Sequence, residues 1–88
     1  MLKRQYQSSE GNIEVNFASP IEYEGRWFCE FHITSEKLED VTTKVWGVDS
    51  LDALLEAINI AKIFLESFHD DGVAIEWLGQ RDFGLSLR

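Results

Sequence analysis

Residues 50–68 form one amphipathic segment whose apolar side chains recur with the period of an α-helix, and this segment constrains the fold most. We expect a helix from about Ser50 to Phe68, with Asp49 or Ser50 as its N-cap, ended by the run Asp70-Asp71-Gly72. Placed at about 100° per residue, its apolar side chains cover an arc of roughly 220°. An arc this wide needs either a strongly curled sheet around the helix or a second chain against it, and we expect the curled sheet. The arc comprises Leu51, Ala53, Leu54, Leu55, Ala57, Ile58, Ile60, Ala61, Phe64, Leu65 and Phe68.

Segments that alternate polar and apolar residues, or are rich in β-branched residues, predict the strands of this sheet. They span residues 12–17, 21–24, 26–34, 41–46 and 73–78, and the tail would extend the sheet through Phe83, Leu85 and Leu87. The element order β-β-β-β-α-β predicts an α+β fold, in which a curled, mainly antiparallel sheet packs around one long helix. A chain of 88 residues supports one core, so we expect a single domain over residues 1–88.

The period of two also predicts which strand side chains face the core. A turn at Gly25 joins residues 21–24 to 26–34, and a three-residue loop would place Tyr23 opposite Trp27. The side chains predicted to face the core are Ile13, Val15, Phe17, Ile21, Tyr23, Trp27, Cys29, Phe31, Ile33, Val41, Thr43 and Val45. Those predicted to face outward are Glu22, Phe28, Glu30, His32, Lys44 and Trp46.

The chain is acidic, with 16 acidic and 8 basic residues and a formal net charge of −8. This charge repels phosphate backbones and anionic lipid, so we expect no nucleic-acid partner and no membrane-surface role. A basic protein is the natural complement, although acidity also serves solubility alone. The single cysteine, Cys29, cannot form an internal disulfide, and no segment reads as a signal peptide or a membrane span. We therefore expect a cytoplasmic protein.

Two motifs and one proline stand out between residues 13 and 66. The motifs are Trp27-x-Cys29-x-Phe31-x-Ile33 and Gly47-x-Asp49-Ser50-Leu51-x-Ala53-Leu54, and Pro20 precedes the first. Together they resemble a family of small bacterial proteins of unknown function. The resemblance implies a bacterial source and a compact α+β fold, and it implies no catalytic residue.

Few side chains have the spacing that metal binding or catalysis requires. Cys29 and His32 are three residues apart in a strand and face opposite sides, so they cannot bind one ion, and we expect Cys29 to be buried and unreactive. His69 near the helix C-terminus suits the helix dipole, whereas a metal site from His69, Asp70 and Asp71 would need three consecutive residues to converge. We expect no metal and no cofactor. With no phosphate loop or nucleophile motif, an enzyme is not favoured, and the strand carboxylates available for acid/base chemistry are Glu22, Glu24, Glu30 and Glu76.

The predicted partner-binding residues lie mainly on the polar arc of the helix. Ile63 falls in the middle of that arc, and acidic and amide side chains surround it. Trp46 faces outward from its strand, and tryptophan is enriched at binding hot spots. The hypothesis is that a basic partner binds here, and the alternative is that Ile63 is one of the single exposed apolar residues common on protein surfaces. The predicted set is Trp46, Asp52, Glu56, Asn59, Ile63 and Glu66.

These observations favour a non-catalytic protein–protein interaction module. Residues 49–76 hold seven acidic residues and one base, Lys62, a formal net of −6, which would steer a cationic partner. An immunity-type protein that neutralises a basic toxin or nuclease fits a small, acidic, single-domain chain. The alternative is a homo-oligomeric structural protein, or a small-ligand binder, in which a neighbouring chain completes the wide apolar arc.

Overall fold

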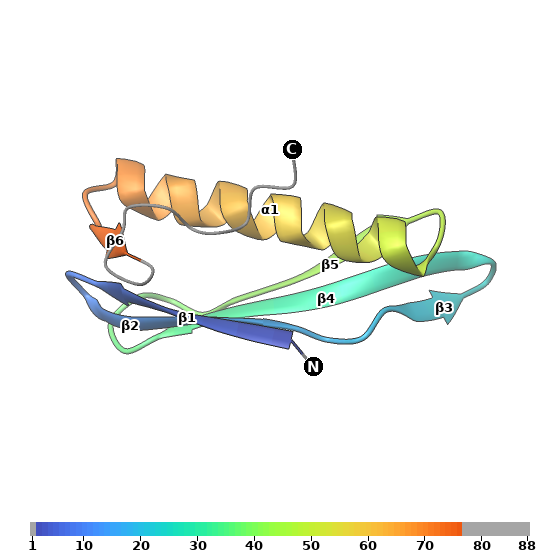
Figure 1. Ribbon diagram of the computed structural model, residues 1–88, viewed down its shortest axis with the longest axis horizontal. Coiled ribbons are helices and arrows are strands. Elements are labelled where there is room, and N and C mark those ends of the chain that lie inside the picture. Colours follow the sequence, from blue (N-terminus) through green and yellow to red (C-terminus); the bar gives the residue numbers. More distant parts are fainter. Residues whose placement is uncertain (1, 77–88) are drawn as a thin grey trace.

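The computed structural model describes residues 2–76, in which a helix lies along one face of an antiparallel sheet (Figure 1). The elements are β1 (Leu2–Ser8), β2 (Gly11–Phe17), β3 (Ile21–Tyr23), β4 (Arg26–Ser35), β5 (Val41–Gly47), α1 (Ser50–Asp70) and β6 (Ile75–Glu76). The predicted α+β class, with a mainly antiparallel sheet and one long helix, is confirmed.

The long strand β4 organises the sheet. One side of β4 pairs with β5, and the other side pairs with β2 near its C-terminal end and with β3 near its N-terminal end. The sheet continues from β2 to β1 and from β1 to β6. Within residues 2–76, the order is therefore β5, β4, then β2 and β3 together, then β1 and β6.

The helix begins and ends where its capping residues predict. The Asp49 side chain accepts a hydrogen bond from the backbone N–H of Asp52 at 2.7 Å, so Asp49 rather than Ser50 is the N-cap. The helix ends at Asp70, two residues beyond Phe68, and Asp71 is the C-cap. Gly72 follows with a positive φ of 94°, a conformation that glycine adopts without steric cost.

The core lies between α1 and the sheet, and small residues on the helix allow close approach. Ala53, Ala57, Ala61 and Leu65 are buried, whereas the large side chains that flank them are only half-buried. The sheet is open and covers the middle of the predicted apolar arc, leaving Leu51 62% exposed and Leu55 38% exposed. The strand side chains that complete the core are Tyr6, Ile13, Val15, Phe17, Cys29, Phe31, Ile33 and Ile75, with Val73 in the turn before β6.

The predicted register of the β3–β4 hairpin is wrong by one residue. The turn has two residues, Glu24 and Gly25, both with positive φ, so Tyr23 pairs with Arg26 and Ile21 pairs with Phe28. A tight turn with two positive φ angles matches the right-handed twist of the strands, which makes it preferable to a three-residue loop. Because a slip of one residue exchanges the two faces of a strand, Ile21 and Tyr23 are exposed rather than buried.

Most other strand predictions are confirmed, and β1 is an addition to them. In β2 and β4 the predicted inward residues are buried or packed against the core, and in β5 Lys44 and Trp46 are exposed as predicted. β1 was not predicted because only Leu2 and Tyr6 are apolar among its residues, so it lacks a period of two. Of the predicted strand 73–78 the structure describes Ile75 and Glu76 as β6, and Trp77, Leu78 and the tail residues Phe83, Leu85 and Leu87 lie outside the described residues.

Cys29 lies in the core and faces away from His32, as predicted. Its side chain is buried, and its thiol donates a weak hydrogen bond to the backbone oxygen of Ala18, with 3.3 Å between sulfur and oxygen. Burial raises the pKa of the Cys29 thiol, so the reactive thiolate is disfavoured in the folded protein.

We expect Cys29 to react with a maleimide at least about a hundredfold more slowly in the native protein than in denaturant, because labelling requires the core to open. A Ser67→Cys variant supplies the control, since Ser67 is exposed on α1. Mass spectrometry of that variant should show one fast and one slow thiol. Equally fast labelling of both would contradict the burial of Cys29.

Candidate protein-binding surface

An aromatic patch covers the outer face of the sheet, opposite α1, at the end where β3 lies. We define the aromatic patch as Ile21, Tyr23, Arg26, Phe28 and Trp46. The strand register assembles it, because Phe28 is the direct pairing partner of both Ile21 in β3 and Trp46 in β5. The rings of Phe28 and Trp46 contact each other with centroids 5.1 Å apart. Tyr23 is 59% exposed, Ile21 is 53% exposed and Trp46 is 39% exposed.

Two cations lie over the aromatic rings of this face. The guanidinium of Arg26 lies 4.8 Å from the ring centroid of Trp46, and the ammonium of Lys44 lies 5.0 Å from that of Phe28. Cation–π contacts of this kind contribute about 0.5–1 kcal/mol at exposed sites. They favour the observed positions of the Trp46 and Phe28 side chains, which also contact each other.

The rest of the outer face is polar, and its side chains bind one another. His32 contacts the Thr42 hydroxyl through Nδ1 at 3.0 Å and the Glu30 carboxylate through Nε2 at 3.1 Å. On the neighbouring strands, the Glu14 carboxylate accepts hydrogen bonds from Asn16 and Gln5. These bonds lower the pKa of Glu14, and the bond from Asn16 has the larger effect. These groups satisfy each other, so the outer face divides into a polar half and the aromatic patch.

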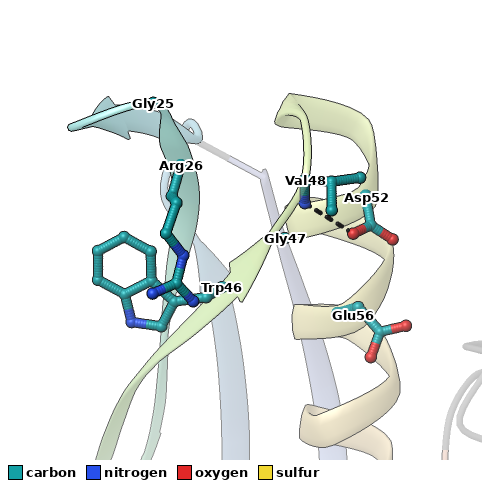
Figure 2. Close-up of a pocket in the computed structure, with 7 residues that line it drawn as sticks. All are labelled: Gly25, Arg26, Trp46, Gly47, Val48, Asp52 and Glu56. Atoms are coloured by element: carbon teal, nitrogen blue, oxygen red, sulfur yellow. Dashed lines mark hydrogen bonds between the residues drawn. The ribbon is translucent and has the colours of Figure 1, made fainter.

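A pocket of about 410 Å³ joins the aromatic patch to the start of α1 (Figure 2). Arg26 and Trp46 border it on the sheet side, and Asp52 and Glu56 border it on the helix side, with the backbone of Gly47 between them. The Asp52 carboxylate accepts a hydrogen bond from the Val48 backbone N–H at 2.9 Å, which holds the β5–α1 connection in place. Gly25 and Val48 complete the lining.

Gly47 allows β5 to pass directly against the first turn of α1. A Cβ atom on Gly47 would lie 2.8 Å from the Cα of Ala53 and closer still to its backbone nitrogen, distances that real Cβ atoms essentially never show. The segment Gly47-x-Asp49 therefore combines a close approach of strand to helix with the N-cap of that helix. The motif that supported the family resemblance thus has a structural purpose at the edge of the pocket.

A model of one protein family, described as a domain of unknown function (DUF6968), matches residues 1–87. The chain belongs to this family. The resemblance to a family of unknown function is therefore confirmed. No curated protein and no solved structure matches the DUF6968 chain.

The structure brings together half of the predicted partner-binding residues of this DUF6968 chain. Trp46, Asp52 and Glu56 all border the pocket. Asn59, Ile63 and Glu66 are exposed further along α1, where Ile63 is 52% exposed and Glu66 approaches Lys62 to 3.9 Å. Ile21, Tyr23 and Arg26 were not predicted for the site, whereas Phe28 was predicted to face outward beside it.

A local signal could have identified two of these missed residues. Glu24-Gly25 between alternating segments is compatible with a two-residue turn, and that turn places Ile21 and Tyr23 on the same face as Phe28.

The described residues contain no group of three or more histidine, cysteine or acidic side chains placed to hold a metal ion. Over the same range, α1 is not apolar enough along its length to cross a membrane.

Proposed function

We propose that this DUF6968 domain is a non-catalytic protein-interaction module that binds its partner through the aromatic patch. The observation that supports the proposal is the gathering of exposed apolar side chains at one end of the molecule. Of the eight large apolar side chains exposed within residues 2–76, six come from β3, the end of β5, the β5–α1 connection and the start of α1, which meet at this end (Figure 1). They are Ile21, Tyr23, Trp46, Val48, Leu51 and Leu55.

The composition of the patch suits a binding surface. Contiguous exposed apolar surface on a small domain marks interaction sites, whereas single exposed apolar residues do not. Tyrosine, tryptophan and arginine are the residues most enriched among those that dominate binding energy. Tyr23, Trp46 and Arg26 supply one of each, and the contacts of Trp46 with Phe28 and Arg26 reduce the ordering that binding would require.

Charge indicates the kind of partner. The formal charge of −8, concentrated in α1 and its flanks, would accelerate encounter with a basic protein. A cationic toxin neutralised by its immunity protein in a bacterial cytoplasm is one pair of this chemistry. A homo-oligomer is the competing proposal, since two copies would cover the same patch.

Site-specific photo-crosslinking in extract of the source cells tests the proposal. A benzoylphenylalanine placed at Tyr23 should crosslink to another protein, and the same probe at Gln5, on the polar half of the outer face, should not. Excess unlabelled protein should suppress the Tyr23 adduct, whereas an equal amount of a Trp46→Ser variant, shown to be folded by circular dichroism, should not. The proposal would be overturned if the probe gave no adduct at Tyr23, or equal adducts at Tyr23 and Gln5. It would also be overturned if the Trp46→Ser variant suppressed the Tyr23 adduct as well as the unaltered protein does. An adduct between two copies of the chain would support the homo-oligomer.

A further inference from the structure

Among residues 2–76, β5 is an edge strand whose outer row of backbone groups has no strand partner. Within residues 2–76 it pairs only with β4, from Trp27 opposite Gly47 to Ile33 opposite Val41. Edge strands of this length are usually protected by proline, bulges, inward charges or exposed lysine side chains, because they offer a template for another strand. β5 has no proline, and its only charged residue, Lys44, faces outward.

The register determines which backbone groups point away from the sheet. The Ala18 N–H, which continues the β2 ladder, donates to the backbone oxygen of Glu30 at 2.9 Å, so Glu30 directs its backbone groups toward β2. Because successive residues of a strand alternate between neighbours, Cys29 and Phe31 direct theirs toward β5. Their partners Val45 and Thr43 bond back to β4. The N–H and C=O groups that remain point to the open edge, and they belong to Thr42, Lys44 and Trp46.

The pocket lies across this edge. Trp46 and Arg26 belong to the outer face of the sheet, whereas Asp52 and Glu56 belong to the helix that covers the inner face, and Gly47 lies between the two pairs (Figure 2). A strand added beside β5 would therefore run along the pocket with alternate side chains on its two sides. One set would meet the indole of Trp46, and the other would meet the carboxylates on α1.

We propose that an extended segment of a basic partner protein adds to β5 as a further antiparallel strand, with cationic side chains turned toward Glu56. This inference rests on the proposed function and specifies the conformation and charge of the bound segment. Main-chain hydrogen bonds would supply affinity, and alternate side chains would supply specificity, as in other cases of strand addition. The Glu56 carboxylate has no hydrogen bond or ion pair within residues 2–76, so it is available to a cation from outside.

The helix residues above the edge define the pattern of the bound segment. Glu56 and Ile63 are seven residues apart, nearly two helical turns, so they lie on one stripe of α1. That stripe offers a carboxylate near the pocket and an exposed apolar side chain about two turns further along α1. The segment that fits it carries lysine or arginine and an aliphatic residue on the same face.

Charge disfavours a second copy of the chain on this edge. Antiparallel pairing of two β5 strands centred on Lys44 would place the two Lys44 side chains opposite each other, and like charges in that position are destabilising. Antiparallel pairing of two β5 strands in any other register would also bring the acidic helices of the two copies side by side. A cationic segment of another protein relieves both conflicts.

Binding of a defined peptide tests the inference. The probe is a fluorescein-labelled heptapeptide with blocked ends, in which four threonines alternate with lysine, valine and lysine, so that the cations share one face. The control peptide, its match in length and composition, has the two lysines adjacent. We expect fluorescence anisotropy to show saturable binding of the alternating peptide and binding about tenfold weaker for its match, because only alternation presents both lysines to α1.

Two pairs of variants locate the binding. Lys44→Pro removes one edge N–H without removing a bond to β4, and it should weaken binding by about tenfold or more, whereas Lys44→Ala should bind the cationic peptide at least as tightly as the unaltered protein. Glu56→Lys should weaken binding by about fivefold to tenfold, whereas Glu66→Lys, the same charge change nearer the other end of α1, should have a smaller effect. Thermal unfolding followed by circular dichroism verifies that each variant is folded, and Glu56→Lys tests the site independently should Lys44→Pro not fold.

Equal binding of both peptides, equal effects within either pair of variants, or a dimer in sedimentation that the peptide does not dissociate would overturn the inference. The proposed function would stand if the Tyr23 crosslink still formed, because that experiment probes the outer face. If the Tyr23 crosslink also failed to form, both the strand-addition inference and the proposed function would be contradicted.

Discussion

The substitution Leu65→Ala should lower the free energy of unfolding by about 2–5 kcal/mol, a large fraction of the stability of a small domain. Leu65 is fully buried on the face of α1 that meets the sheet, in line with Ala61, Ala57 and Ala53. Since those neighbours are already alanine, none of their side chains can rotate to fill the space, and a cavity remains. Urea unfolding followed by tryptophan fluorescence would measure the loss.

Leu51→Ala is the matched control for this prediction. It removes the same atoms from the same helix, but Leu51 is largely exposed, so we expect a loss below about 1 kcal/mol. Similar losses at both positions would mean that α1 is rotated relative to the sheet. A small loss at Leu65 alone would mean that the site collapses around the smaller side chain.

Gly47→Ala should destabilise the protein by about 1–3 kcal/mol or more, because the new methyl group would overlap the backbone of Ala53. A backbone cannot move aside as a flexible side chain can, so relief requires the start of α1 to shift away from β5. That shift would also open the pocket, whose two sides meet at Gly47. Equilibrium unfolding would measure the destabilisation, and the peptide affinity of the folded variant would report the change in the pocket.

Val48→Ala tests whether the effect belongs to Gly47 or to the connection as a whole. The Val48 side chain is 83% exposed, and only its backbone N–H bonds to Asp52, so we expect a change within about 0.5 kcal/mol. If Gly47→Ala were as harmless as Val48→Ala, the close contact between β5 and α1 would be absent in solution.

Features that depend on neighbouring residues in the chain could be predicted from the sequence. The alternation in β2, β4 and β5 identified which side chains face the core, and the helix period with a cap at Asp49 or Ser50 identified α1. β1 escaped prediction because a strand with two apolar residues carries no clear period. The hairpin register depended on a choice between two turn geometries, and that choice decided the exposure of Ile21 and Tyr23.

The amino-acid sequence by itself determined the faces of β2, β4 and β5, the approximate extent of the helix, and the acidic charge, because each depends on local periodicity or on composition. Only the tertiary structure decided which side chains from separate elements meet. The proximity of Tyr23, Phe28 and Trp46 follows from pairing between three strands, and the placement of Trp46 and Glu56 on opposite sides of one pocket follows from the approach of α1 to β5 at Gly47. The open edge of β5 also depends on the order of strands in the sheet, and no local pattern specifies that order.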